Sequence, residues 1–149
     1  MQTAVRPARF EETKTIYALM RRVIHVTVAP PLQLETIGNV ESNVAAWLDR
    51  PNECLHLVAT HNGRIVGVVL IKDFWNLCSL FVEESHQGSG IGRLLIEAAV
   101  LACKSRSPKQ AIFLNSYPSA VGFYEHLGFT SRESTQQLQE GVRPMQLSL

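Results

Sequence analysis

The stretch from Leu77 to about Arg106 constrains the fold more than any other part of the chain. It opens with a short apolar run, LCSLFV, at residues 77–82. Leu80 and Val82 point to one side of a strand and Phe81 to the other, so the run predicts a strand buried on both faces. Farther along, apolar residues recur at helical spacing, so the hydrophobic period changes from about 2 to about 3.6 residues. A strand, a glycine-rich turn and a helix are therefore expected in succession.

Three glycines within five positions, Gly88, Gly90 and Gly92, separate this strand from the helix. Glycine costs backbone entropy, and a plain turn needs fewer of them. Bare backbone lets another molecule approach the N–H groups of a helix N-terminus, which carries roughly half a positive charge and unpaired donors. The turn therefore predicts a phosphate-binding cradle. It is neither a P-loop, which needs Gly-Lys-Ser/Thr, nor a dinucleotide-binding turn, because G-x-G-x-x-G is not completed.

The pattern that remains, Gln-x-x-Gly-x-Gly after a strand ending in Leu-x-Val, resembles the acetyl-coenzyme A loop of the GNAT N-acetyltransferases. Downstream, Ala111-Ile112-Phe113-Leu114 predicts a strand. After it, Ala-x-x-Phe-Tyr-x-x-Leu-Gly-Phe at 120–129 is similar to the second signature segment of the same superfamily. The resemblance covers roughly Val66 to Phe129. Two segments in this order and spacing are stronger support than either alone.

The resemblance implies an α/β architecture, the GNAT fold. This is a mixed, mostly antiparallel sheet of about seven strands with helices on both faces. Its two central strands, here 77–82 and 111–114, are splayed apart. Splaying leaves backbone N–H and C=O groups without partners, which buried structure rarely tolerates unless a ligand pairs with them.

The rest of the chain predicts the order β-α-α-β-β-β-α-β-α-β-β. Asn62-Gly63 between two β-rich runs favours a hairpin, because a type I′ turn needs positive φ at both central residues. The remaining expected elements are a strand at 3–6, a helix from 10 to about 26, a loop up to 40, a short helix at 41–49, strands at 55–60 and 64–72, and a closing antiparallel pair at 130–138 and 142–149.

The composition predicts a single domain over residues 1–149 in the cytoplasm. The formal net charge of +1 gives no global field that favours nucleic acid or a membrane surface. No apolar run is long enough to span a bilayer, and the N-terminus shows no signal pattern. Cys54, Cys78 and Cys103 lie far apart without C-x-x-C spacing, which predicts reduced thiols and no metal site.

The resemblance also implies a binding site for acetyl-CoA, the expected co-substrate. The pantetheine arm pairs with the exposed strand edge near Phe81 and Val82, and the diphosphate lies on the N–H groups of residues 87–93. A backbone N–H within residues 80–82 donates to the developing oxyanion. The cofactor-binding residues implied are Leu80, Phe81, Val82, Gln87, Gly88, Ser89, Gly90, Ile91, Gly92, Arg93, Asn115 and Tyr124.

The chemistry implied is direct attack of an amine on a thioester. Tyr124 occupies the place of the tyrosine that protonates the departing thiolate, and its reference pKa near ~10 keeps it protonated at neutral pH. Asn115 is assigned to the cofactor cleft, although Tyr117 stands where the family commonly has asparagine. No residue is assigned as general base. Each carboxylate considered is more typical of a solvated surface group, and a water relay needs none; the four are Glu35, Asp73, Glu83 and Glu84.

The leading function is therefore an acetyl-CoA-dependent N-acetyltransferase that acts on a primary amine of a small molecule or peptide. The alternative is a non-catalytic acyl-CoA-binding or regulatory module on the same fold, since a fold does not fix a function. A generic nucleotide-binding domain ranks third. Transfer to oxygen, a longer acyl chain and the identity of the acceptor stay open. A homodimer is also compatible with the family, but no stretch identifies an interface.

Overall fold

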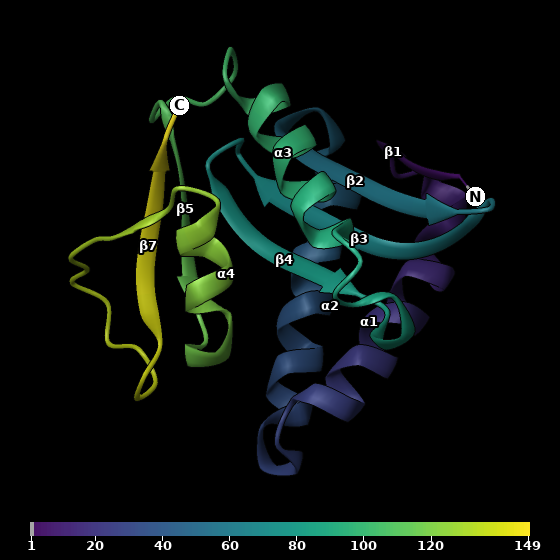
Figure 1. Ribbon diagram of the computed structural model, residues 1–149, viewed down its shortest axis with the longest axis horizontal. Coiled ribbons are helices and arrows are strands. Elements are labelled where there is room, and N and C mark those ends of the chain that lie inside the picture. Colours follow the sequence, from purple (N-terminus) through teal and green to yellow (C-terminus); the bar gives the residue numbers. More distant parts are fainter. Residues whose placement is uncertain (1) are drawn as a thin grey trace.

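The computed structural model describes residues 2–149, which form a seven-stranded sheet flanked by helices (Figure 1). The strand order is β1-β2-β3-β4-β5-β7-β6, and all neighbouring strands are antiparallel except β4 and β5. The predicted fold class and order of elements are confirmed. The elements are β1 (Thr3–Pro7), α1 (Thr13–Thr27), α2 (Gln33–Asp49), β2 (Cys54–His61), β3 (Arg64–Lys72), β4 (Asn76–Val82), α3 (Ile91–Cys103), β5 (Ala111–Ser116), α4 (Val121–His126), β6 (Thr130–Ser131) and β7 (Arg143–Ser148).

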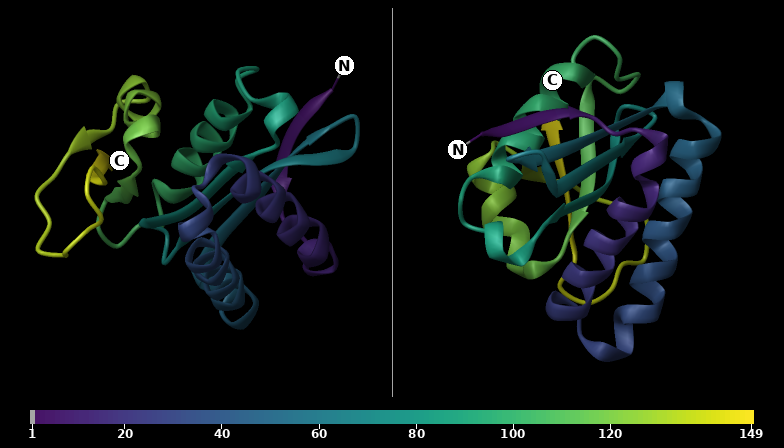
Figure 2. Two further views of the ribbon diagram at one scale, coloured as in Figure 1. Left: turned by 90° about the horizontal axis from the view of Figure 1, so that it is seen from below. Right: turned by 90° about the vertical axis from the view of Figure 1, so that its right-hand side faces the viewer.

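The helices cover both faces of the sheet (Figure 2). One face packs against α1 and α2, and the other packs against α3 and α4, so the sheet separates two hydrophobic cores. Leu80 and Val82 contact the core under α3, whereas Phe81 contacts the core under α1 and α2. This alternation confirms that β4 has an apolar layer on each side.

Gly67 in β3 allows α3 to approach the sheet closely. A Cβ atom at this position would lie 3.0 Å from Leu95 Cδ1 and 3.2 Å from Ile91 Cγ2, closer than apolar atoms normally pack. Gly67 is also the partner of Val82 in the β3–β4 ladder. The contact therefore places the first turn of α3 beside the end of β4.

The splay of the two central strands is confirmed. β4 and β5 form a single parallel bridge between Asn76 and Phe113. Beside it, the N–H of Phe113 donates to the carbonyl oxygen of Trp75 at 2.7 Å. Farther along, β4 stays paired with β3 and β5 with β7, so the two strands diverge and the sheet opens between them.

The predicted start of the second helix is wrong. A helix was expected at 41–49, but α2 begins at Gln33. The prolines at 30–31 lie in a short 3₁₀ turn that leads into it, since proline suits the first helical turn, where its missing N–H costs no hydrogen bond. The Gln33 side chain donates to the carbonyl oxygens of His25 and Val28 at 3.1 and 3.0 Å, which ties α2 to the end of α1.

The closing strand pair is shorter than predicted. A strand was expected at 130–138, but β6 contains only Thr130 and Ser131 and pairs with β7. The polar run at 133–137 carries no apolar alternation that would hold one face of a strand against the core. Residues 132–142 therefore form an irregular connection.

The β2–β3 hairpin is confirmed: Asn62 and Gly63 have φ values of 51° and 82°, as a type I′ turn requires. All three cysteines are free thiols, and Cys54 and Cys103 are buried. None of the helices in residues 2–149 combines the length and apolar character needed to cross a bilayer. Over the same residues, no group of three or more His, Cys, Asp or Glu side chains is arranged to hold a metal ion.

Candidate active site

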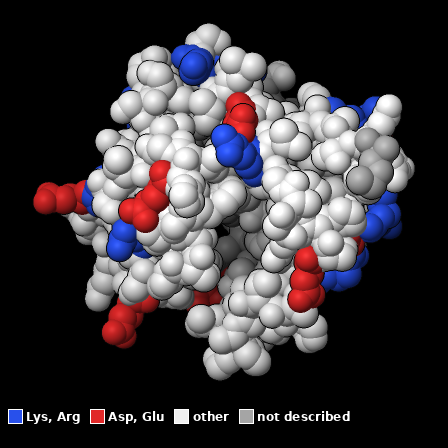
Figure 3. All heavy atoms as spheres, viewed as in Figure 1, with Lys and Arg blue, Asp and Glu red and all other residues white. Residues whose placement is uncertain are grey.

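The parted strands border a cavity of about 580 Å³, here called the β4–β5 cleft. Figure 3 shows a hollow on this face, between the positions that Figure 1 gives for α4 and β4, and most of its visible wall is uncharged. The α1–α2 connection, β4, the glycine turn, β5 and α4 all contribute to the lining. The predicted site residues that line the cleft are Leu80, Phe81, Val82, Gln87, Asn115 and Tyr124.

The edge of β4 presents unpaired backbone N–H groups to this cleft. The N–H of Glu83 donates to the carbonyl oxygen of Val66 in β3 at 2.8 Å. Alternate residues of a strand face the same neighbour, so the backbone groups of Phe81 also face β3. Those of Leu80 and Val82 face the cleft instead. Two N–H groups, two residues apart, are thus available to an extended ligand.

The opposite wall is the edge of β5. Because the N–H of Phe113 faces β4, the backbone groups of Asn115, two residues later, face the cleft as well. The Asn115 side chain is exposed and has no hydrogen-bond partner within residues 2–149. Tyr117 is 51% exposed and also lines the cleft. Asn115 and Tyr117, the tyrosine that stands where the family commonly has asparagine, therefore both lie at this wall.

The glycine turn ends at the N-terminus of α3, beside the cleft. Gly88 and Gly90 have φ values of 81° and 88°, in the left-handed region that glycine adopts without strain. The first helical hydrogen bond runs from the N–H of Leu94 to the carbonyl oxygen of Gly90, at 3.0 Å. In the part of the chain that the structure describes, the N–H groups of residues 88–93 have no acceptor. Free donors at a helix N-terminus favour an anion.

The polar side chains of the turn are held within the protein. Gln87 Nε2 donates to the carbonyl oxygen of Val82 at 3.0 Å, which fixes the turn to the end of β4. Ser89 Oγ donates to a carbonyl oxygen of the same turn. Arg93 is exposed, and its Nε lies 2.7 Å from Glu97 Oε1 on the next helical turn. The guanidinium is thus directed along α3, while the backbone N–H of Arg93 is one of the free donors at the start of the helix.

Ile91 and Gly92 position the glycine turn through packing. The Ile91 side chain is buried in the core under α3. A Cβ atom on Gly92 would lie 3.2 Å from Phe123 Cζ of α4. The absence of a side chain at position 92 therefore allows α4 to lie against the start of α3.

Tyr124 of α4 lines the cleft and is 7% exposed. Its ring packs edge-on against Phe123 and Phe129, with centroid separations of 5.1 and 5.5 Å. Burial raises the pKa of Tyr124 to about 12, because the phenolate would lose its hydration. The hydroxyl has no hydrogen-bond partner among the described residues. The Tyr124 hydroxyl therefore stays protonated at neutral pH.

Ser79 is a cleft residue that the sequence reasoning missed. It is 4% exposed, it lines the cleft, and its Oγ is buried without a hydrogen-bond partner within residues 2–149. A buried hydroxyl without a partner costs free energy and is uncommon. The signal in the sequence was a lone hydroxyl inside an otherwise apolar strand.

The carboxylates considered as bases all lie outside the cleft. Glu83 accepts hydrogen bonds from both terminal nitrogens of Arg64 at 2.9 Å, and this contact lowers the pKa of Glu83. Asp73 is paired with Arg50 at 2.9 Å. Glu35 and Glu84 do not line the cleft either. Among residues 2–149, no carboxylate or imidazole side chain lines the cleft.

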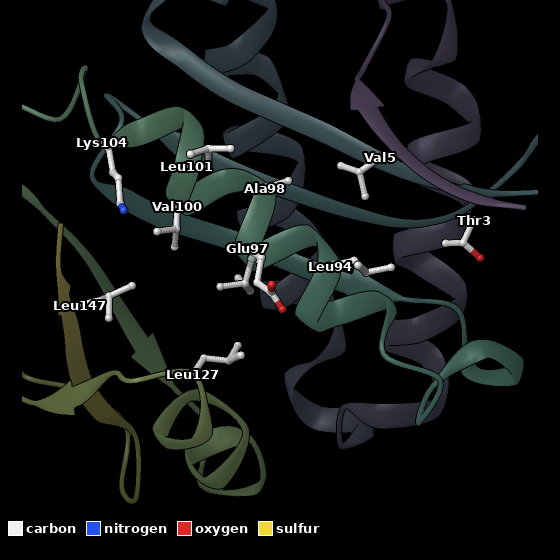
Figure 4. A pocket seen from close by; sticks show the side chains of 11 residues that line it. Thr3, Val5, Leu94, Glu97, Ala98, Val100, Leu101, Lys104, Leu127 and Leu147 are labelled. Carbon is white, nitrogen blue, oxygen red and sulfur yellow. The ribbon is translucent and has the colours of Figure 1, made fainter.

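A larger cavity of about 660 Å³ lies on the outer side of α3 (Figure 4). Leu94 and Leu101 border it from the helix, Val5 from β1, and Leu127 and Leu147 from the region of α4 and β7. Its wall is mainly aliphatic and carries neither the unpaired strand edge nor the glycine turn. The β4–β5 cleft is therefore the candidate site despite its smaller volume.

Comparison with known proteins agrees with this geometry. The family model described as an acetyltransferase (GNAT) domain matches residues 28–149. The peptidyl-lysine N-acetyltransferase YjaB of Escherichia coli is 28% identical over 130 residues, which cover 87% of this chain and 83% of that protein.

Two solved structures share the fold. The PaiA N-acetyltransferase of Thermoplasma acidophilum, in complex with coenzyme A, has a TM-score of 0.81 at 15% identity, covering 100% of both chains. The putative acetyltransferase YncA of Salmonella typhimurium, with its cofactor acetyl-CoA, has a TM-score of 0.76 at 19% identity, covering 99% of this chain and 94% of that one.

The chain belongs to the GNAT acetyltransferase family. It is accordingly an acyltransferase, and acetyl-CoA is the co-substrate of the class to which it belongs.

Proposed function

We propose that this protein transfers the acetyl group of acetyl-CoA to a primary amine. The observation that carries the proposal is the open strand edge of the β4–β5 cleft, which leads directly to the free N–H groups of the glycine turn. A pantetheine arm has amides that can pair with the groups of Leu80, Val82 and Asn115. The diphosphate next to it suits the N–H groups of residues 88–93.

The reaction that fits the cleft is direct transfer. The amine nitrogen forms a bond to the thioester carbon, a cleft-facing N–H of β4 donates to the oxyanion, and the carbon–sulfur bond breaks. Tyr124 gives its proton to the departing thiolate and regains one from solvent, while water takes the proton that the amine loses. YjaB, named for peptidyl-lysine, supports a lysine-like amine as the acceptor.

An acyl-enzyme route through cysteine is not favoured. Cys78 is the cysteine that lines the cleft, and burial raises the pKa of its thiol to about 12. The nucleophile in such routes is the thiolate, which is therefore scarce at neutral pH. The Cys78 thiol also donates a hydrogen bond to the carbonyl oxygen of Leu70, with Sγ 3.5 Å from that oxygen.

The proposal is tested with protein refolded or washed free of bound ligand. Calorimetry measures binding of acetyl-CoA, and release of the CoA thiol is followed in the presence of a lysine peptide. Binding together with acceptor-dependent thiol release is expected. Tight binding without turnover on any amine would favour the non-catalytic module, and absence of binding would overturn both.

Gly90→Ala is expected to weaken acetyl-CoA binding about tenfold. At φ 88° an alanine is strained by ~1–2 kcal/mol, so the turn must relax and its N–H groups lose their common direction. Gly63→Ala is the matched control, because Gly63 has φ 82° and no atom within 4 Å of an added Cβ, as at Gly90. Both variants should lose similar thermal stability, and only Gly90→Ala should change the Kd. Equal Kd values for Gly90→Ala and Gly63→Ala would contradict the proposal that the glycine turn binds the diphosphate.

Ser79→Ala is expected to lower kcat/KM for the amine about fivefold and to leave the Kd of acetyl-CoA unchanged. We propose that the buried hydroxyl orients the incoming amine, a hydrogen bond worth ~1 kcal/mol. Because Ser79 Oγ has no partner within the described protein, its removal should not lower the melting temperature. Ser107 supplies the contrast: its buried hydroxyl donates to the carbonyl oxygen of Ala111 at 3.0 Å, so Ser107→Ala should lose stability while keeping kcat/KM. The role of Ser79 is excluded if Ser79→Ala acetylates amines as well as the parent.

A further inference from the structure

A second cavity of about 440 Å³ adjoins the β4–β5 cleft on the α2 side of the sheet. It is named here the amide pocket, because the polar part of its wall is dominated by Asn39, Asn43, Asn76, Asn115 and Gln139. The pocket and the cleft are continuous. The residues that line both are Thr36, Leu77, Cys78, Phe81, Asn115 and Tyr117.

Four asparagines converge on this pocket from three elements. Asn39 and Asn43 lie one turn apart on the same side of α2. Asn76 forms the single β4–β5 bridge, and Asn115 follows two residues after its partner in β5. In the residues that the structure describes, none of the four side-chain amides has a hydrogen-bond partner. Their donors and acceptors are therefore available to a ligand.

Among residues 2–149, none that lines the cleft or the amide pocket carries a charged side chain at neutral pH. This absence restricts the acceptor. A polyamine has two or more ammonium groups. The groups that do not react would lose their hydration on entering the pocket, and no carboxylate there would offset that free-energy cost. A single amine on an otherwise neutral molecule meets no such cost.

Among neutral acceptors, the free asparagine amides favour those that contain peptide groups. Each side-chain amide offers two donors on nitrogen and two acceptor positions on oxygen, which matches the N–H and C=O of a peptide group. The rim of the pocket is open, since Asn39, Gln139 and Tyr117 are exposed. An open rim allows a chain to enter on one side of the reacting residue and leave on the other.

Resting on the proposed function, we propose that the amide pocket binds the main chain of a peptide acceptor and presents one lysine side chain to the β4–β5 cleft. Polyamines are excluded by the uncharged wall. The specificity thus comes from the asparagines of α2 and from the point where β4 and β5 part. The hydrocarbon stem of the lysine would pass between Leu77 and Phe81, which line both cavities.

The test compares three acceptors at saturating acetyl-CoA: a lysine tripeptide blocked at both ends, spermidine and glucosamine. The protein is expected to prefer the tripeptide over each of the others by at least about tenfold in kcat/KM. The double substitution Asn39→Asp and Asn43→Asp supplies two carboxylates of nearly the same shape. It should raise the ratio of spermidine to tripeptide by at least about tenfold, because each new ion pair stabilises the second ammonium.

Asn52→Asp is the matched control, since it makes the same chemical change at an exposed site that lines neither cavity. Its acceptor ratio should equal that of the parent, and all variants should keep the parent Kd for acetyl-CoA. A parent that prefers spermidine or glucosamine overturns the inference, as does an unchanged ratio in the double variant. In both cases acetyl transfer persists and the proposed function stands. Binding of acetyl-CoA without transfer to the tripeptide also overturns the inference about the pocket, whereas the proposed function is rejected only when no amine is acetylated.

Discussion

Tyr124→Phe is expected to lower kcat at least about 100-fold at neutral pH, since a positioned general acid contributes typically ~10²–10⁴-fold. The substitution removes only a hydroxyl that has no partner in the described protein, so the ring packing against Phe123 and Phe129 should persist. The melting temperature and the Kd of acetyl-CoA should therefore stay close to those of the parent. Single-turnover measurements separate this loss of chemistry from a change in product release.

The pH dependence adds a second readout. The pKa of about 12 keeps Tyr124 protonated throughout the range in which the protein is assayed. A lysine amine has a reference pKa near ~10.4, so kcat/KM should rise with pH as the amine loses its proton. Loss of the Tyr124 proton should not lower kcat/KM below about pH 11, one unit under the pKa of Tyr124. Tyr17→Phe on α1, away from the cleft, serves as the control; if Tyr124→Phe retains the kcat of this control from pH 7 to 9, Tyr124 is not the acid.

The cleft-facing N–H groups of β4 should be as important as the tyrosine. Replacing one amide by an ester, with the hydroxy-acid analogue of Leu80 or of Val82, deletes a single N–H and keeps the side chain. Loss of one oxyanion donor costs roughly 10²–10³ in kcat. One of the two esters should show this loss, and the other should raise the Kd of acetyl-CoA, because its N–H pairs with the pantetheine arm.

Phe81 provides the control within the same strand. Its N–H faces β3, so an ester there should reduce stability by the ~1 kcal/mol typical of a net hydrogen bond and leave kcat in place. The esters at Leu80 and Val82 remove an N–H from the cleft side of β4, and the ester at Phe81 removes one from the β3 side. Esters at both Leu80 and Val82 that keep kcat within threefold would exclude a β4 oxyanion donor.

The parts of the fold that could be predicted are those with a local physical cause. Asn62-Gly63 predicted its turn because positive φ at two residues leaves few alternatives. The apolar alternation of Leu80 and Phe81 predicted a strand between two layers. The start of α2 could not be read in the same way, because the prolines at 30–31 are compatible with the end of one helix and the beginning of the next.

The sequence predicted which residues belong to the candidate site better than it predicted which way their backbone and side-chain groups face. The glycines and Tyr124 have local signatures, so their place near one cleft followed from the resemblance. Which N–H of β4 faces that cleft depends on pairing with β3, a contact distant in the sequence. Ser79 was missed for a related reason, since burial without a partner is a property of the assembled walls and not of the strand alone.

The single bridge between Asn76 and Phe113 has a mechanical consequence. Apart from that bridge and the chain connections, the two half-sheets have no shared ladder, so a bound acyl donor would act as the missing strand between them. Occupancy and rigidity would then rise together: at a ligand concentration of 100 times the Kd, binding stabilises a folded protein by ~2.7 kcal/mol. A molecule consumed in every turnover would also be a structural component of the domain, which would loosen and tighten once in each cycle.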